Sequence, residues 1–246
     1  MNSLLRQSLP PFVFNKLIKI NRDFIRQGYV GLNGLDKKLI DAIKPRRNGY
    51  YVELGSNDGV RQSNTYKLHK SFSWSGLLID PSPFLLRECQ INRQFDPIPS
   101  TVCCACVPFS FKSPCVIIED SDLMSVAKGL DVSDDLAISH ANKGTLYLRP
   151  NYFRRNYLAS ARSLTSVLDE VDAPRRFDLL SLDVEGNELA VLGGLDLVKY
   201  RPHWVLIEVR DRKSIFEFMA KNRYNHFSDL SSYDHYSDSL FCCMDA

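Results

Sequence analysis

The sequence lacks any hydrophobic run long enough to cross a bilayer. Its longest N-terminal candidate, residues 9–20, is interrupted by two prolines, two lysines and an asparagine. A membrane-spanning helix needs about 20 consecutive apolar residues, and a signal peptide needs an apolar core of about 7–15. We therefore expect neither a membrane span nor secretion, and we expect the protein to be cytoplasmic.

The cysteine spacings of metal sites and of disulfide frameworks are also missing. The seven cysteines, an odd number, include no CxxC pair and no Cys/His ligand pattern. Reduced thiols in a cytosol fit this usage best. Three of them fall within Thr101–Cys106 beside strand-forming valines, so we interpret this stretch as a buried core strand rather than a soft-metal cluster.

No charge of one sign dominates the chain. Lys and Arg number 31 against 29 Asp and Glu, for a net charge of +2. Because proteins that bind polyanions usually carry a marked basic excess, a nucleic acid is not the expected partner. The 246 residues show no internal repeat and suit one large domain rather than two. These features leave the oligomeric state open.

Apolar bursts rich in β-branched and aromatic residues alternate with longer helix-capable segments, the pattern of a parallel sheet covered by helices on both faces. Near the C-terminus, Tyr224–Leu230 and Ser239–Met244 flank a polar turn and predict an antiparallel pair. We expect an α/β, Rossmann-like fold with a mostly parallel seven-stranded sheet. The five earlier predicted strands are Tyr50–Leu54, Gly76–Ile79, Thr101–Cys106, Phe177–Leu182 and Trp204–Val209.

Two regions lie outside this regular alternation. Residues 1–48 predict an N-terminal helical appendage to the main domain of residues 49–246, with two helical segments between Phe12 and Lys44 that are broken at Gly28–Gly34. The segment Cys115–Leu148 has strand-like stretches, CVIIE and TLYL, on either side of a polar stretch. Its details stay open.

The first chemical motif, YVELGSNDGVRQSNT, spans Tyr51–Thr65 and reads as a strand that ends in an ExGxxxG loop before a helix. Its two glycines allow close backbone approach to a ligand, and the helix N-terminus offers free N–H groups to a carboxylate. The Glu53 carboxylate could meet an amino group, and S-adenosylmethionine carries both charges on its methionine part. A GxGxxG dinucleotide fingerprint is absent. The alternative interpretation of the motif is a structural turn that binds no cofactor. The predicted cofactor loop comprises Glu53, Gly55, Ser56, Asn57, Asp58 and Gly59.

The second motif, FSWSGLLIDPSP at Phe72–Pro83, places Asp80 at the carboxyl end of the next strand. A ribose diol would lie there, across the crevice from the glycine loop, and two hydroxyls suit one carboxylate. Pro81 stiffens the turn and could frame an adenine edge. Alternatively, the prolines of this turn merely start a helix.

Two further motifs end strands in carboxylates. FDLLSLDVEGNELAVLGGL at Phe177–Leu195 carries Asp183 and Glu185 at a strand end and Glu188 on the next helix, and RPHWVLIEV ends near Glu208. Carboxylates at neighbouring strand ends face the same crevice, where Asp183 and Glu208 could share a substrate or a divalent cation. For Glu188 the alternative is a first-turn acid that favours the helix dipole, and for Glu208 it is a helix cap.

Together, YVELGSNDGVRQSNT, GLLIDPSP with the later Asn92 and Arg93, and FDLLSLDVEGNELAVLGGL resemble the FkbM family of methyltransferases over about Gly49–Arg210. The resemblance implies a class I S-adenosylmethionine-dependent fold and O-methylation, with sugar and polyketide hydroxyls among the acceptors. It also implies roles for individual residues. Glu53, Gly55, Asn57 and Gly59 would hold the methionine portion, Ser63 and Asn64 would stabilise the loop and the helix start, Asp80 would hold the ribose, and Asp183 would stand near the transferred methyl.

We expect methyl transfer to a hydroxyl, most naturally that of a sugar in a glycan or glycoconjugate, with Asp183 as the base and Glu185 or Glu208 orienting the acceptor. The histidines at 69, 140 and 203 are weaker base candidates, since only their ordinary pKa favours them. Two alternatives stay open. One is 2'-O-methylation of a nucleic-acid cap, which the near-neutral charge disfavours, and the other is a non-catalytic interaction module on the same fold.

Overall fold

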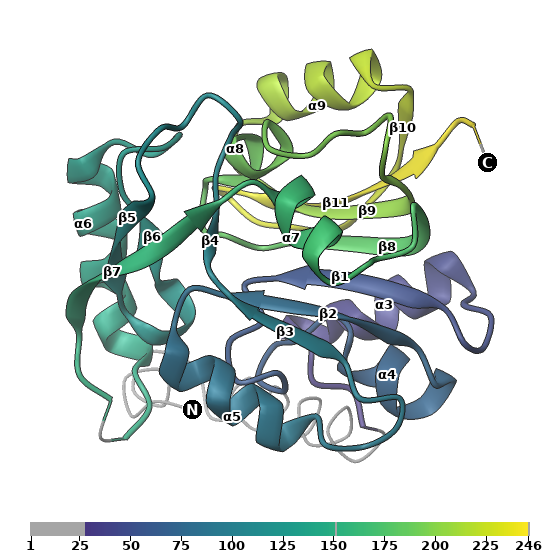
Figure 1. Cartoon of the computed structure of the whole chain (residues 1–246), viewed down its shortest axis with the longest axis horizontal. Helices are drawn as coiled ribbons and strands as arrows, with labels where there is room; N and C mark the ends of the chain where they lie inside the picture. Colours follow the sequence, from purple (N-terminus) through teal and green to yellow (C-terminus); the bar gives the residue numbers. More distant parts are fainter. Residues whose placement is uncertain (1–27, 151, 246) are drawn as a thin grey trace.

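The main sheet of this computed structural model, which describes residues 28–150 and 152–245, has seven strands in the order β10-β11-β9-β8-β1-β2-β3 (Figure 1). Four pairings, β1 with β2, β1 with β8, β2 with β3 and β8 with β9, are parallel. The strands are β1 (Tyr50–Leu54), β2 (Ser75–Asp80), β3 (Ser100–Cys103), β8 (Arg176–Leu182), β9 (Arg201–Val209), β10 (Tyr224–Ser232) and β11 (Ser237–Cys243).

The C-terminal strands make the sheet mixed rather than purely parallel. β11 is antiparallel to both of its neighbours, β9 and β10. The predicted antiparallel pair and the α/β class are therefore confirmed. The other five strands of this sheet, β9, β8, β1, β2 and β3, are parallel to one another, as predicted for the centre of the sheet.

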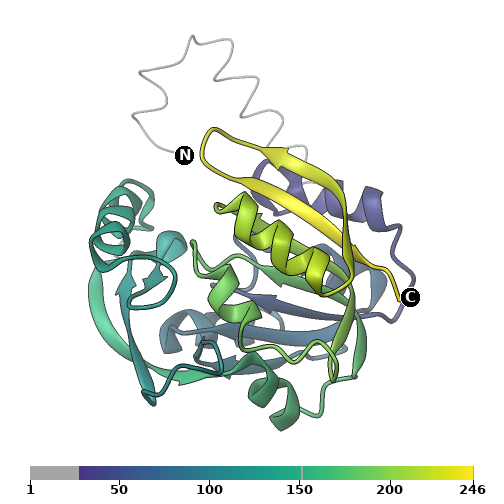
Figure 2. The same ribbon diagram turned by 90° about the horizontal axis from the view of Figure 1, so that it is seen from above.

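Strand residues alternate between two apolar cores, as the period of two requires. Tyr51 and Leu179 contact the core under α3 (Leu35–Ile43), α4 (Tyr66–Phe72) and α5 (Pro83–Asn92). Val52 and Leu180 contact the core under α7 (Leu164–Glu170), α8 (Glu188–Leu192) and α9 (Arg212–Lys221). Figures 1 and 2 show these helices on opposite faces of the sheet.

The predicted strand Thr101–Cys106 is wrong as a single element. β3 ends at Cys103, and a short β4 (Ala105–Cys106) then pairs in parallel with β7 (Arg155–Arg162) in a second sheet. The chain changes sheets here because Asp80, the last residue of β2, is already paired with Cys103, so β2 offers no further ladder partners. Cys104 and Cys106 are nevertheless buried in the main core, as predicted.

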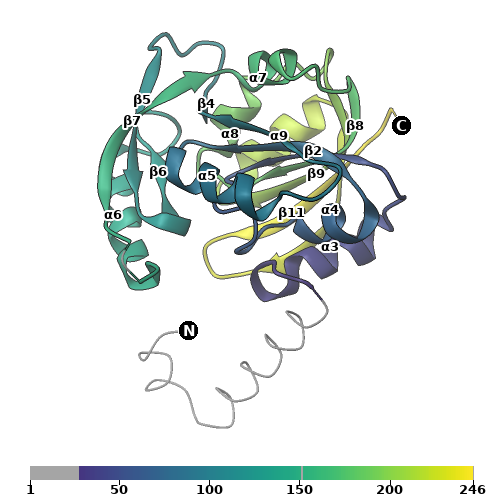
Figure 3. The ribbon, with the colours of Figure 1, turned by 60° about the horizontal axis from the view of Figure 1, so that its bottom comes forward.

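The second sheet has the order β4-β7-β5-β6 and includes β5 (Cys115–Asp120) and β6 (Val126–Ala127). We call residues 105–162 the cap. It also holds α6 (Asp134–Gly144) and two 3-10 helices, η2 (Asp122–Met124) and η3 (Thr145–Tyr147). CVIIE is thus confirmed as a strand, whereas TLYL is helical. Figure 3 shows the cap beside the sheet, near the end where β2 passes into α5.

The N-terminal prediction is tested only in part. Its second helical segment corresponds to α3, the predicted break contains the short η1 (Leu32–Gly34), and the segment beginning at Phe12 lies outside the described residues. The division at residue 48 stays a prediction. No helix within residues 28–150 and 152–245 is long and apolar enough to cross a membrane.

Candidate functional site

A cavity of about 590 Å³ lies between the carboxyl ends of the central strands and the cap. Its volume is in the range of sites for cofactors and small molecules, about 300–1,000 Å³. Because parallel strands end at the same edge of a sheet, residues far apart in sequence meet on its wall. Seven of the predicted site residues line it, namely Gly55, Asn57, Asp80, Pro81, Asp183, Glu185 and Glu208.

The glycine loop after β1 follows an unusual backbone path. Gly55 and Gly59 have φ of +76° and +77°, values that L side chains rarely adopt. A Cβ on Gly55 would lie 1.9 Å from the carbonyl oxygen of Asp183, and one on Gly59 would lie 2.6 Å from the sulfur of Cys89. The two glycines are therefore required by close packing of the loop against β8 and α5.

Asp80 joins the loops that follow β1 and β2. One carboxylate oxygen accepts the N–H of Asn57 at 2.9 Å, and the other accepts the N–H of Ser82 at 2.8 Å. Burial raises the pKa of Asp80 to about 6, although both backbone donors lower it. The carboxylate keeps acceptor capacity beyond these two bonds, since each of its oxygens can accept more than one.

Glu53 is buried outside the cavity wall, in the layer beneath the loop. Its carboxylate accepts the N–H of Asn64 at 2.8 Å and the hydroxyls of Ser63 and Thr65 at 3.0 and 2.6 Å. The fully buried Arg93 guanidinium lies 3.5 Å away and also donates to the Gly59 carbonyl at 2.5 Å. These bonds hold the loop in shape.

The other predicted loop residues lie in the same layer or on its edge. Asp58 accepts the N–H groups of Val60 and Arg61 at 2.9 and 2.8 Å, which closes the turn. Direct cofactor contact stays a prediction for every residue of the expected site, and six of them do not line the cavity, namely Glu53, Ser56, Asp58, Gly59, Ser63 and Asn64.

Three carboxylates converge with one guanidinium at the far end of the cavity. Arg210 Nη2 lies 2.6 Å from Glu185 Oε2 and 2.5 Å from Glu208 Oε1. Burial raises the pKa values of Asp183 and Glu208, and the neighbouring carboxylates raise them further, against the lowering effect of Arg210. A half-buried carboxylate with a raised pKa is a better proton acceptor at neutral pH than a solvated one.

Glu188 has a structural role in this region. It accepts the N–H groups of Val184 and Gly186, both at 3.1 Å, and burial raises its pKa to about 7. The neighbouring Asn187 accepts the N–H of Asp131 at 3.1 Å and donates to the Ala127 carbonyl at 3.0 Å. The loop after β8 is therefore fixed both internally and to the cap.

The cap brings polar groups to the cavity that sequence reasoning missed or ranked low. His140 of α6 lies 2.7 Å, Nε2 to Oε2, from Glu185. Asp122 accepts the Asn57 side-chain amide at 3.3 Å and the Arg61 guanidinium at 2.8 Å. Only the polar, aperiodic character of residues 120–142 hinted at such a role.

No group of three or more His, Cys, Asp or Glu side chains in the described part of the chain is arranged to hold a metal ion. All seven cysteines are free thiols.

Comparisons with known proteins agree with the motifs. A family model described as the Methyltransferase FkbM domain matches residues 53–230. No curated protein matches the chain. Similar solved structures include an FkbM methyltransferase from Methylobacillus flagellatus KT (14% identity, 79% of this chain and 43% of that one, TM-score 0.46). Another is the magnesium protoporphyrin IX methyltransferase ChlM from Synechocystis PCC 6803 with bound SAM (9% identity, 99% and 100% coverage, TM-score 0.43). The chain spans less than half of the length of the M. flagellatus protein.

Proposed function

The chain belongs to the FkbM methyltransferase family, and we propose that it transfers the methyl group of S-adenosylmethionine to a hydroxyl oxygen of a sugar in a glycan or glycoconjugate. One observation carries the proposal. Gly55, Asp80 and Asp183, which follow or end three adjacent parallel strands, line one cavity of about 590 Å³. This is the crevice in which α/β sheets of this type bind ligands.

The residues present fit the charges of the cofactor. Asp80 has spare acceptor capacity for a ribose diol, and Pro81 borders the same part of the wall. Gly55, which is exposed, and Asn57 line the cavity, and the backbone of this loop would hold the methionine portion, with Glu53 and Arg93 keeping the loop in shape beneath it. The Asp183 carboxylate would complement the positive sulfonium.

In the proposed mechanism, bound S-adenosylmethionine supplies a methyl group activated by its positive sulfur. The cavity holds the acceptor oxygen in line with that methyl, which provides most of the rate gain. Asp183 would take the proton of the acceptor hydroxyl as that oxygen receives the methyl group. Glu185 and Glu208, both held by Arg210, orient the acceptor.

A polyhydroxylated acceptor suits the far end of the cavity. Carboxylates accept hydrogen bonds from hydroxyl groups and guanidinium groups donate them to hydroxyl oxygens, and the wall there carries three carboxylates and one guanidinium. The Arg210 guanidinium also lies over the Tyr236 ring, 5.5 Å from its centroid. We further propose that the protein acts in the cytoplasm, where free thiols persist.

Calorimetric titration with S-adenosylmethionine and S-adenosylhomocysteine tests the cofactor site. We expect micromolar binding to the wild type that is lost in Asp80→Ala. Asp196→Ala is the matched control, because Asp196 also accepts two backbone N–H groups, at 2.9 and 3.0 Å, but lies outside the cavity. Absence of binding to the wild type would refute the methyltransferase proposal and favour an interaction module.

The acceptor is tested separately. Purified enzyme with labelled cofactor is screened against sugar and glycan acceptors, and against capped RNA at low and high salt. Methylation of sugars alone supports the proposal. Salt-sensitive methylation of RNA would replace it with the nucleic-acid alternative.

A further inference from the structure

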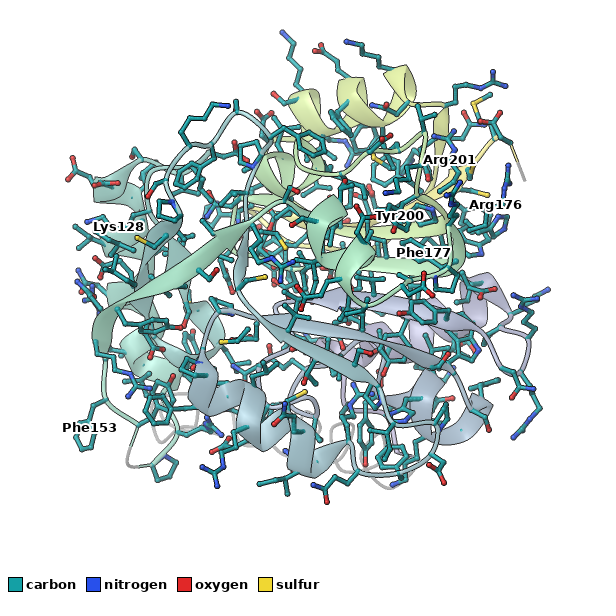
Figure 4. The ribbon with its side chains drawn as sticks, viewed as in Figure 1. Lys128, Phe153, Arg176, Phe177, Tyr200 and Arg201 are labelled. Atoms are coloured by element: carbon teal, nitrogen blue, oxygen red, sulfur yellow. The ribbon has the colours of Figure 1, made fainter. Side chains whose placement is uncertain are left out.

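A second pocket of about 200 Å³ lies at the opposite end of the sheet from the cofactor cavity. It opens where β8 and β9 begin, because Arg176 and Arg201 are their first residues and pair with each other in the ladder. Figure 4 shows these two side chains together beside Phe177. The lining residues are Arg46, Arg176, Phe177, Asp178, Arg201, His203 and Cys243.

Positive charge exceeds negative charge in this pocket. The Arg46 guanidinium makes a bidentate ion pair with the Asp178 carboxylate, with nitrogen–oxygen distances of 3.0 and 3.2 Å, and so neutralises it. Arg176 donates to the main-chain carbonyl of Asp245 at 3.3 Å and has no carboxylate partner among the described residues. Among the residues that the structure describes, the Arg176 guanidinium on the pocket wall therefore has no counter-charge.

At the edge of this pocket, Arg201 already pairs with a carboxylate of its own chain, that of Asp245, which does not itself line the pocket. The two oxygens of the Asp245 carboxylate lie 2.8 Å from Arg201 Nη2 and 2.6 Å from Arg223 Nη2. The Arg201 side chain is only 14% exposed, and its guanidinium lies over the Tyr224 ring, 4.7 Å from the centroid. Arg201 is thus held in place near Arg176, while Arg223, whose side chain is 69% exposed, reaches the same carboxylate from outside the pocket.

We propose that this pocket binds a phosphate group and that Asp245 is an internal anion which the phosphate displaces. Guanidinium forks match the oxygens of phosphate as well as those of carboxylate, and charge-assisted bonds of this kind are roughly twice as strong as neutral ones. A phosphate dianion would engage Arg201 and Arg223 in place of Asp245 and would also neutralise Arg176. The site does not depend on the proposed methyl transfer.

Calorimetric titration of the full chain with pyrophosphate tests the site. Arg176→Gln should weaken binding by about tenfold or more, the loss of one hydrogen-bonded charge. Asp245→Asn should tighten binding several-fold, since the internal competitor loses its charge. Arg212→Gln is the matched control, because Arg212 is a 53%-exposed arginine of α9 that pairs with Asp229 outside this pocket. It should change the affinity by less than about twofold.

A second experiment distinguishes a soluble phosphorylated ligand from a lipid headgroup. It measures binding of the protein to phosphatidylcholine vesicles with and without phosphatidic acid. Pyrophosphate binding that requires Arg176, without vesicle binding, assigns the pocket to a soluble phosphorylated ligand. Vesicle binding that requires both phosphatidic acid and Arg176 assigns it to a lipid headgroup. Absence of both, or an equal loss of affinity in Arg176→Gln and Arg212→Gln, would overturn the site. Thermal unfolding of each variant establishes that it is folded.

Discussion

Gly55 and Asp183 are in backbone contact. A Cβ built on Gly55 would lie 1.9 Å from the carbonyl oxygen of Asp183, and the Asp183 N–H donates to the carbonyl of Leu54, which precedes Gly55, at 3.4 Å. The cofactor loop and the proposed base are therefore positioned by main-chain packing rather than by side-chain rotamers. A side chain at position 55 has to displace the segment that carries the base.

Gly55→Ala should damage both stability and cofactor binding. The positive φ and the clash with Asp183 each add strain, so we expect the free energy of unfolding to fall by at least about 2 kcal/mol. The affinity for S-adenosylmethionine should fall by at least about tenfold, the effect of about 1.4 kcal/mol. Chemical denaturation and calorimetry measure the two effects.

Gly129→Ala separates the clash from the backbone strain. Gly129 has a similar φ of +70°, but a Cβ there would meet nothing within 4 Å. It should lose only about 1 kcal/mol of stability and keep its affinity for the cofactor. Equal effects of the two substitutions would contradict the importance of the Gly55–Asp183 contact.

Asp183→Asn should abolish proton abstraction while keeping the shape of the cavity. The amide cannot accept the hydroxyl proton, so initial rates should fall by about 100-fold or more, the usual contribution of a positioned base. The affinity for S-adenosylhomocysteine, which has no positive sulfonium for Asp183 to complement, should change by less than about threefold. Asp238→Asn is the control, because Asp238 is a buried carboxylate of β11 that does not line the cavity. Unchanged turnover in Asp183→Asn would remove Asp183 from catalysis.

The raised pKa of Asp80 makes the folded protein without cofactor pH-sensitive. Its pKa rises from 3.8 to about 6 on folding, so the folded state holds this proton more tightly than the unfolded state does. Asp80 therefore contributes up to about 3 kcal/mol to the free energy of unfolding at low pH. This contribution is lost as pH rises from about 4 to about 6.

Asp80→Asn removes that titration. As pH rises from about 4 to about 6, the wild type should lose up to about 3 kcal/mol of unfolding free energy through Asp80, and Asp80→Asn should not show this loss. Urea denaturation at several pH values gives both curves, with Asp135→Asn, at an exposed position on α6, as the control that should run parallel to the wild type. Parallel curves for Asp80→Asn would show that this carboxyl does not titrate differently on folding.

The sequence predicted the central strands and the meeting of their terminal carboxylates for a physical reason. Tyr50–Leu54 matches β1, and Phe177–Leu182 differs from β8 by one residue, because buried strands require continuous apolar runs. Parallel strands then bring Asp80, Asp183 and Glu208 to one edge. Strand ends alone were sufficient to locate the crevice.

Glu53 shows where the strand-end argument is insufficient. The side-chain period of two places it on the same face as Tyr51, beneath the loop and toward Ser63 and Arg93.

The cap was still harder to predict from the sequence. The contact of His140 with Glu185 joins residues 45 positions apart through a segment without apolar periodicity, so no local pattern encodes it.

Arg210 pairs with both Glu185 and Glu208, so its removal should leave Glu208 without a cationic partner among the described residues and Glu185 with His140 alone. For Arg210→Gln we expect the free energy of unfolding near pH 7 to fall by about 2 kcal/mol, which is below the usual loss for a buried pair because the Arg210 side chain is 31% exposed. The loss should shrink near pH 5, because the Glu208 carboxyl, whose pKa is raised by burial and by its neighbouring carboxylates, then takes up a proton and needs no counter-charge. Arg212→Gln, the exposed equivalent, should cost less than about 0.5 kcal/mol at either pH. An equal loss for Arg210→Gln at both pH values would show that the arginine acts through packing, and the proposed electrostatic support of the acceptor end of the cavity would have to be abandoned.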